Sequence, residues 1–267
     1  MSVFQALVLG VLQGLAEFLP ISSSAHLALA PWLFGWPSPG LAFDTSLHLG
    51  TLVAVLWYFQ EEWRRLIASA WEIARTRQVT TESHRRVIFL IIATIPGGIA
   101  GLLLEDMAET VFRAPVITAI ALIVLGVLLW AVDRWAAHDR PLGGMRWTDA
   151  LLFGLAQVAA LVPGVSRSGS TMTMGRALRF TREGAAVFSF LMSMPITFAA
   201  VAVKLPDAVR EQERLLPLVV GVIASGASGW LAISVLLKFV ARHSFGVFAL
   251  YRIALGVFVL VLLSMRG

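Results

Sequence analysis

Cysteine is absent from the 267 residues, and charged residues make up only 14% of them. Without cysteine there is no disulfide, no thiolate nucleophile and no cysteine-ligated metal, which excludes several enzyme classes. Apolar residues reach 58%, whereas soluble chains have about 45 to 50% apolar and about 25% charged residues. A soluble core of this size cannot enclose so much apolar surface. The chain is therefore expected to be an integral membrane protein.

Six apolar runs, almost free of charge, have the length that crosses a hydrocarbon core of about 30 Å. They predict membrane-spanning helices at about 43–59, 87–104, 115–132, 185–203, 215–237 and 245–263. A cleavable signal peptide is not expected, because the amino terminus has no Lys or Arg to form a basic flank. The formal net charge of +5 comes from arginines in short loops. Such arginines favour the cytoplasmic side and anionic lipid head groups, so nucleic acid is not expected as a partner.

Loop charges predict the orientation of the spans. The Arg-rich loops Gln60–Arg86 and Asp133–Trp147 are assigned to the cytoplasm, and the acidic loop Glu105–Arg113 to the outside. Residues 1 to about 41 then start and finish outside. This segment is too apolar for a free tail, yet it is interrupted at residues 20–24. It is interpreted as a re-entrant hairpin over residues 1–35, because loose backbone at membrane depth needs cover from protein or water.

The same layout recurs at residues 147–179, where an apolar helix breaks at residues 163–169. Moving the sequence by 144 positions pairs Gly10 with Gly154, Gln13 with Gln157 and Ser22 with Ser166. The predicted fold class is therefore an all-α polytopic membrane protein with about six transmembrane helices and two re-entrant helical hairpins. It forms a single membrane domain, 1–267, of two inverted-topology repeats, 1–133 and 146–267. Such repeats place a binding site near the midplane, where the helix breaks meet.

Ionisable and hydroxyl residues gather at both breaks. Ionisable residues at this depth are expensive and usually functional. The first hairpin carries Gln13, Glu17, Ser22, Ser23, Ser24 and His26, and the second carries Ser166, Arg167, Ser168, Gly169 and Thr171. Asp44 and His48, four apart on the first span, form a second tier that either lines the same cavity or makes a local pair. Arg176, Arg179 and Arg182 are expected only to flank the membrane.

This set of residues suits a phosphorylated ligand. A helix restarting after each break presents free backbone N–H groups to anions, and Arg167 offers a planar fork to phosphate oxygens. Glu17 with Gln13 is predicted to hold a divalent cation, Mg²⁺ first and Ca²⁺ second, because hard cations bridge carboxylates to phosphates. Each residue also has a plainer interpretation: the serines as helix caps, His26 as a core histidine, and Arg167 as a snorkelling side chain.

At these residues the sequence resembles the undecaprenyl-diphosphatase family, also called the bacitracin-resistance protein family. The first motif runs from Gln13 to His26 as QGLAEFLPISSSAH, and the second from Pro163 to Thr171 as PGVSRSGST. The order, the separation and the span pattern agree over nearly the whole chain. The first acidic place of the family pattern is taken here by Gln13, which leaves Glu17 as the only acid of that motif.

The resemblance implies an enzyme that hydrolyses undecaprenyl diphosphate to undecaprenyl phosphate and inorganic phosphate. It would thereby recycle the lipid carrier for peptidoglycan synthesis and confer bacitracin resistance. It also implies a multi-pass protein of the bacterial inner membrane, a divalent cation, and an active site open to the periplasmic or outer leaflet. Catalytic roles are carried over to Glu17, Ser23, His26 and Arg167, and diphosphate binding to Ser22, Ser24, Ser166, Ser168, Gly169 and Thr171. Membrane lipids are expected partners, and a homodimer is left open.

Two alternatives stay open. The nucleophile is either His26, through a phosphohistidine, or Ser23 with His26 as its base. The rival function is a polyprenyl-phosphate lipid transporter or flippase, since inverted repeats also support alternating access. A phosphatidic-acid type membrane phosphatase is not indicated, because its Lys-containing motif is absent and the only lysines are Lys204 and Lys238.

Overall fold

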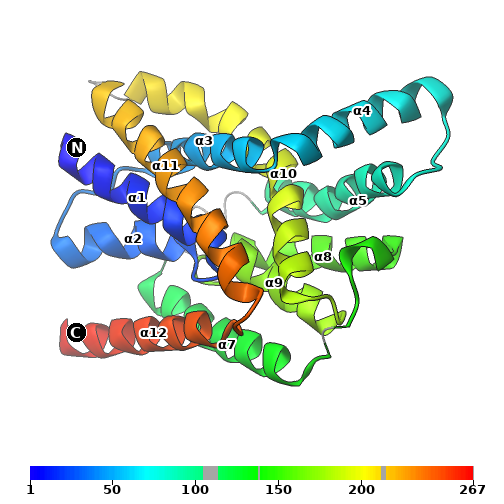
Figure 1. Ribbon diagram of the computed structural model, residues 1–267. Helices are drawn as coiled ribbons and strands as arrows, with labels where there is room; N and C mark the ends of the chain where they lie inside the picture. The colour runs from blue at the N-terminus through cyan, green and yellow to red at the C-terminus, as the bar shows by residue number, and fades with distance from the viewer. Residues whose placement is uncertain (105–113, 138, 212–214, 267) are drawn as a thin grey trace.

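The computed structural model describes residues 1–104, 114–137, 139–211 and 215–266, and these residues fold almost entirely as helices. The predicted outside loop at 105–113 lies beyond the described residues. Helices pack side by side around a central region where several of them begin or end (Figure 1). Their bounds are α1 Val3–Phe18, α2 Ser23–Phe34, α3 Leu41–Tyr58, α4 Gln60–Thr76, α5 Glu82–Leu103, α7 Pro115–Trp135, α8 Trp147–Val158, α9 Arg167–Ala177, α10 Arg182–Glu211, α11 Leu215–Val240 and α12 Gly246–Arg266.

Six helices are long and apolar enough to cross a membrane, which confirms the predicted number and class of spans. They are α3, α5, α7, α10, α11 and α12, and each overlaps one of the six apolar runs. The described residues contain no β-strand beyond a single isolated bridge between Arg140 and Phe180. The chain is therefore an all-helical, multi-pass membrane protein.

The structure corrects two predicted loops. Residues 60–76, taken as part of a cytoplasmic loop, form the helix α4, which follows α3 after Phe59 alone. One face of α4 carries the buried Leu66 and packs against α5, and Glu62 forms an ion pair with Arg86 of α5. The segment from Lys204 also stays helical, because α10 continues to Glu211. Charge patterning marked Gln60–Arg86 as extramembrane, and the predicted span 185–203 ended before Lys204, but neither pattern indicated that the helices continue there.

Two pairs of shorter helices match the predicted helix-break-helix segments. The first break separates α1 from α2 and spans only residues 19–22, and the second, between α8 and α9, contains the short 3₁₀ helix η3 (Ala159–Leu161). Both second helices begin earlier than predicted, since Ser23 and Arg167 are already helical. Ser23, Ser24 and Arg167 therefore lie in the first turns of helices, where side chains have fixed directions.

Glycines allow two close helix crossings that frame the centre. A Cβ at Gly10 of α1 would lie 2.2 Å from the carbonyl oxygen of Gly221 in α11. A Cβ at Gly154 of α8 would lie 2.6 Å from the carbonyl oxygen of Ala93 in α5. Both distances are too short for a side chain, so each crossing requires glycine. These contacts hold α1 and α8, which lead into the two breaks.

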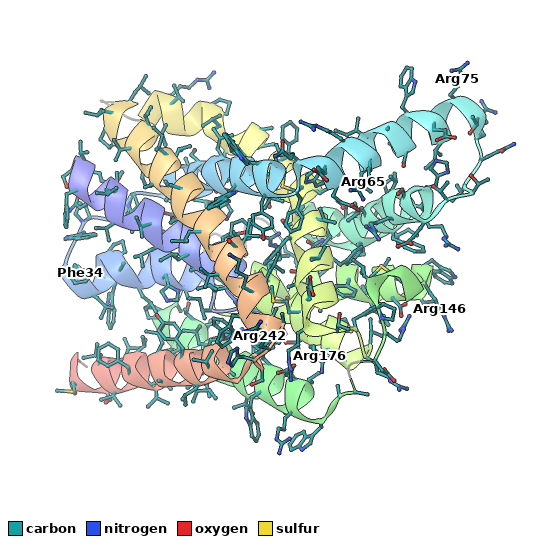
Figure 2. The ribbon with its side chains drawn as sticks, in the orientation of Figure 1. Phe34, Arg65, Arg75, Arg146, Arg176 and Arg242 are labelled. Carbon is teal, nitrogen blue, oxygen red and sulfur yellow. The ribbon has the colours of Figure 1, made fainter. Side chains whose placement is uncertain are left out.

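Arg176 is not a membrane-flanking residue, contrary to the sequence prediction. Its side chain is completely buried and donates a hydrogen bond of 2.7 Å from Nε to Oδ1 of Asp133 in α7 (Figure 2). Arg182 also donates to this carboxylate, which in turn accepts the backbone N–H of Phe245. A buried charge needs such pairing, so this cluster ties α7, α9, α10 and the start of α12 together. Arg179 is exposed and forms an ion pair with Asp139.

Candidate active site

The two breaks have the same local geometry. Ser22 and Ser166 precede α2 and α9 as N-caps, and their φ angles of 76° and 70° lie in a region that side-chain-bearing residues rarely adopt. Each hydroxyl accepts the backbone N–H three residues on, from Ala25 and Gly169. Each also lies 3.2 Å from the hydroxyl of the serine two residues further on, Ser24 and Ser168. The serines do act as caps, and the turns they form are unusual.

The two turns are also bonded to each other. The backbone N–H of Gly164 donates to Oγ of Ser22 over 3.2 Å, and Oγ of Ser168 donates to the carbonyl of Leu19 over 3.1 Å. Motifs that lie far apart in the sequence therefore meet in one region, as the sequence predicted.

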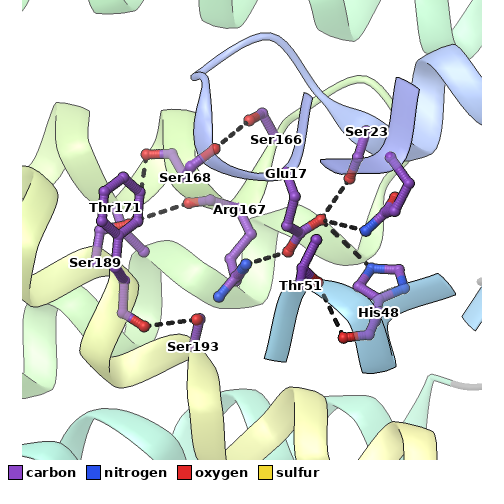
Figure 3. A network of polar contacts seen from close by, with 12 residues as sticks. Glu17, Ser23, His48, Thr51, Ser166, Arg167, Ser168, Thr171, Ser189 and Ser193 are labelled. Carbon is purple, nitrogen blue, oxygen red and sulfur yellow. Dashed lines mark hydrogen bonds and ion pairs between the residues drawn. The ribbon is translucent and has the colours of Figure 1, made fainter. Parts of the chain in front are cut away.

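Glu17 is the centre of the polar cluster that results (Figure 3). Its carboxylate is 7% exposed, and Oε1 forms an ion pair with Nη2 of Arg167 from the other motif. Oε2 accepts hydrogen bonds from Oγ of Ser23 at 2.7 Å and from Nε2 of Gln13 at 3.0 Å. Nε2 of His48 lies 3.4 Å from the same oxygen. Side chains from α1, α2, α3 and α9 thus converge on one carboxylate.

A cavity of about 270 Å³ opens beside this cluster. Its apolar part is contributed mainly by η3 and α10, which provide an environment of low polarity for the charged groups. The polar residues that line it are Glu17, Ser23, Ser24, Thr45, His48, Gln157, Ser166, Arg167 and Thr197. An acid, a cation and several hydroxyls therefore face one cavity, and such a set suits a phosphate group.

Four of the predicted phosphate-binding residues are absent from the lining of this cavity in the described chain. Ser22 and Ser168 are buried and connect the two turns. Thr171 is a buried residue of α9 whose hydroxyl lies 2.6 Å from that of Ser189 in α10. Gly169 donates its N–H to the cap Ser166. In this structure these residues support the shape of the site, while Ser24 and Ser166 remain exposed to the cavity.

His26 lies apart from the Glu17 cluster. Its Nδ1 is 2.7 Å from the carbonyl oxygen of Ser22, and its Nε2 is 2.7 Å from the hydroxyl of Tyr251, whose ring stacks on it at 5.7 Å. Because a carbonyl oxygen only accepts, Nδ1 carries a proton, and Nε2 of the neutral ring accepts from the tyrosine. Both ring nitrogens are therefore engaged away from the cavity.

Of the two second-tier residues, Asp44 and His48, only His48 has its side chain in the cavity lining. His48 lines the cavity and contacts Glu17, whereas Asp44 contributes its backbone carbonyl, which lies 3.1 Å from Nδ1 of His48. The imidazole of the cluster is thus supplied by the first span. His48 was a weaker prediction than His26 because a histidine four residues from an aspartate is common as a local helix pair.

Few side chains in the site could act as ligands for a metal cation. No group of three or more His, Asp or Glu side chains in the described residues is placed to hold a metal ion. Among the described residues Glu17 is the only carboxylate lining the cavity, and Oε1 of the neighbouring Gln13 is a buried oxygen without a hydrogen-bond partner. One carboxylate and one amide oxygen suit Mg²⁺ of the kind held largely by substrate phosphates and water. These two residues therefore fit a cation only if substrate phosphates and water supply most of its ligands.

Sequence reasoning missed several polar residues around the site. Gln157 and Thr45 line the cavity, and Tyr251 and Arg252 of α12 contact the two motifs from behind. Two of them carried a signal: Gln157 pairs with Gln13 in the internal repeat, and Arg252 is a charge inside an apolar span. Thr45 and Tyr251 carried none, because only folding brings α3 and α12 to the breaks.

Comparison with known proteins finds one matching family and several similar full-length proteins. The model of a family described as bacitracin resistance protein BacA matches residues 6–258. A protein of Gemmatimonas aurantiaca named undecaprenyl-diphosphatase is 64% identical over 266 residues, which cover 100% of both chains. Proteins of the same name from Pelotomaculum thermopropionicum and Desulforudis audaxviator are 49% and 47% identical, with 98% and 100% of their lengths covered and 100% of this chain in each case.

Proposed function

The chain belongs to the bacitracin resistance protein BacA family, and on this premise we propose that it hydrolyses undecaprenyl diphosphate to undecaprenyl phosphate and inorganic phosphate. It is a multi-pass membrane protein. We place it in the bacterial inner membrane, among the membrane lipids and its lipid substrate. Recycling of the carrier for peptidoglycan synthesis, and with it bacitracin resistance, follows from this reaction.

The observation that carries the proposal is the contact between Ser23 and Glu17 beside Arg167. A hydroxyl that donates to a carboxylate at 2.7 Å has a base in place to take its proton. Arg167 adds a cation from the opposite motif, and Ser24 and Ser166 add hydroxyl donors to the same cavity. The N-termini of α2 and α9 begin beside it and favour negative charge. Phosphoryl transfer needs mainly this positioning and charge stabilisation.

In the mechanism we propose, Oγ of Ser23 attacks the terminal phosphorus of the diphosphate while Glu17 accepts the serine proton. The bond from that phosphorus to the bridging oxygen breaks, and the prenyl monophosphate leaves with the electron pair. Water then attacks the phosphoserine, which releases inorganic phosphate and restores the Ser23 hydroxyl. Arg167 binds the oxygens of the transferred phosphoryl group throughout. Glu17 and Gln13 are the residues that would hold Mg²⁺, which neutralises phosphate charge when bound.

A phosphohistidine on His26 is the alternative intermediate. It requires Nε2 to leave the Tyr251 hydroxyl and the ring to turn toward the cavity, since Nδ1 is occupied by the Ser22 carbonyl. Chemical stability separates the two intermediates, because phosphoserine survives acid and phosphohistidine does not. Substrate labelled in its terminal phosphate, quenched during turnover, should leave acid-stable label on wild type. Acid-labile label that disappears in His26→Ala would reject Ser23 as the nucleophile.

We also propose that the two halves are inverted repeats, each with a re-entrant hairpin. Support comes from the matched caps Ser22 and Ser166 and from the matched glycine crossings at Gly10 and Gly154. Further support comes from Figure 1, where α1 and α2 approach the centre from the side of both chain termini, and α8 approaches from the opposite side. The site then lies where the two hairpin tips meet, near the midplane.

The orientation we propose places both termini and the connection between α2 and α3 outside. In Figure 2, Phe34 lies on that side, while Arg75 and Arg146 lie on the opposite, Arg-rich side. Cysteine substitution gives a clean test because the chain has none. Ser38→Cys should react with an impermeant thiol reagent in intact cells, and Gln78→Cys only after rupture. The reverse pattern would place the site toward the cytoplasm.

The first experiment is phosphate release from undecaprenyl diphosphate by the detergent-purified protein, with Mg²⁺ or with chelator. Ser23→Ala and Arg167→Ala should each lose nearly all activity, and Ser46→Ala, a buried serine that bonds only within its own helix, is the matched control. Wild type that binds the lipid without releasing phosphate would favour the lipid transporter or flippase. A homodimer remains a proposal that light scattering of the same preparation tests.

A further inference from the structure

Arg252 is a buried charge that the reaction itself does not use. It is the only charged residue of α12 between Gly246 and Met265, and its side chain is 0% exposed. Charged residues within membrane spans are rare and usually functional. Within the described residues it forms no ion pair, and its hydrogen bonds all go to backbone carbonyls. Arg252 is also absent from the lining of the described cavity, so any role in the reaction acts through other residues.

The carbonyls that Arg252 binds belong to both breaks. Nη1 donates to the carbonyl of Pro20 over 3.3 Å, just before the cap of α2. Nη2 donates to the carbonyls of Gly164 and Val165 over 2.9 Å and 2.8 Å, just before the cap of α9. Each turn is thus bound by a different nitrogen of one guanidinium. Because that group is planar and rigid, the spacing of its nitrogens sets the spacing of the two turns.

Gly169 supplies the room for this contact. A Cβ at Gly169 would lie 2.4 Å from Nη1 of Arg252, so any larger residue would displace the guanidinium. The caps beside these carbonyls, Ser22 and Ser166, both have the uncommon positive φ. Such conformations persist only where the surrounding structure holds them. The bonds from Arg252 are part of that surrounding structure for both caps.

We propose that Arg252 is a positioning residue that sets the two phosphate-binding turns relative to each other. It thereby holds Glu17 and Ser23, from the first motif, at the right distance from Arg167 of the second. This inference rests on the proposed function, because the reaction needs groups from both motifs. A lysine at this position has a single nitrogen and cannot bind both turns as the guanidinium does.

The test compares Arg252→Lys and Gly169→Ala with Arg176→Lys in the full-length purified protein. Arg176 is an equally buried arginine that binds Asp133 and backbone carbonyls away from the cavity. We expect Arg252→Lys and Gly169→Ala to lower kcat by about 10²-fold, the effect of a misplacement of about 1 Å, with a smaller change in KM. The double variant should be little worse than either single one. Arg176→Lys should lower Tm while keeping kcat near wild type.

A second readout needs no catalysis. Spin labels at Ala28→Cys of α2 and Ala177→Cys of α9, both exposed, report the separation of the helices that follow the two turns. Arg252→Lys should shift or broaden that distance distribution. An unchanged distribution, or a kcat no lower than that of Arg176→Lys, would overturn the positioning role. If wild type releases no phosphate, the proposed function fails, and the label distances still decide whether Arg252 sets the turns.

Discussion

Ser22 and Ser166 lie 144 positions apart in the chain and share one uncommon backbone conformation, with φ of 76° and 70°. In each, the hydroxyl caps the following helix, and the first turn of that helix lies beside the common cavity. Glycine adopts this φ without strain, whereas alanine keeps the strain and removes the cap.

We therefore expect Ser166→Gly to be more stable than Ser166→Ala by about 1 kcal/mol. The same order should hold for Ser22. Unfolding in detergent, followed by tryptophan fluorescence, measures the difference. Ser189→Ala, at a helical position, provides the baseline for loss of a buried hydroxyl. Equal stability of the glycine and alanine variants would mean that the backbone conformation carries no strain.

Glu17 and Ser23 should behave as one catalytic unit. Glu17→Gln removes the base and Ser23→Ala the nucleophile, and each should lower kcat by about 10² to 10⁴-fold. Because both act in one step, the double variant should be about as slow as the slower single variant. Phosphate release measures kcat, and Ser46→Ala again controls for the loss of a buried hydroxyl. Multiplicative effects in the double variant would show that the two residues serve separate steps.

Gln13→Glu should strengthen cation binding. The substitution places a second carboxylate next to Glu17, at a buried position whose amide oxygen has no hydrogen-bond partner. Mg²⁺ prefers carboxylate oxygens, and the cation would offset the repulsion between the two acids. We expect half-maximal activity at about tenfold lower Mg²⁺ than in wild type, a change of about 1.4 kcal/mol.

The control for this change is Gln5→Glu, the same substitution on the same helix, in the exposed capping box with Ser2 and outside the cavity lining. Its Mg²⁺ dependence should stay close to that of wild type. An unaltered Mg²⁺ requirement in Gln13→Glu would place the cation elsewhere or remove it from the reaction.

Gly10→Ala should destabilise the protein through the crossing of α1 and α11. The added methyl would lie 2.2 Å from the carbonyl oxygen of Gly221, which belongs to rigid helical backbone. Overpacking of this kind costs about 1 to 3 kcal/mol. Gly101→Ala is the matched control, because nothing lies within 4 Å of its added methyl. It should be neutral or stabilising by up to about 1 kcal/mol, and thermal unfolding compares the two.

The six spans were predictable because each is a continuous property of local sequence: an apolar run long enough to cross the bilayer. The breaks were predictable for the same reason, since Pro20 and Pro163 interrupt apolar helices next to serine-rich stretches. Residue types alone also brought Glu17, Ser23 and Arg167 together as candidates. The helix α4 was missed because its stability comes from packing on α5, which no local pattern reveals.

The residues around the site also fall into two groups, those predictable from local sequence and those placed by packing between helices. By itself, the sequence determined the membrane class, the two breaks and the chemical character of the motifs, since these follow from composition and from which residues are neighbours along the chain. Only the tertiary structure decided that His48 faces Glu17 while His26 turns to Tyr251, and that Arg252 binds both turns. These contacts depend on the rotation and crossing of helices that are remote in sequence, and packing between helices sets those angles rather than any single segment.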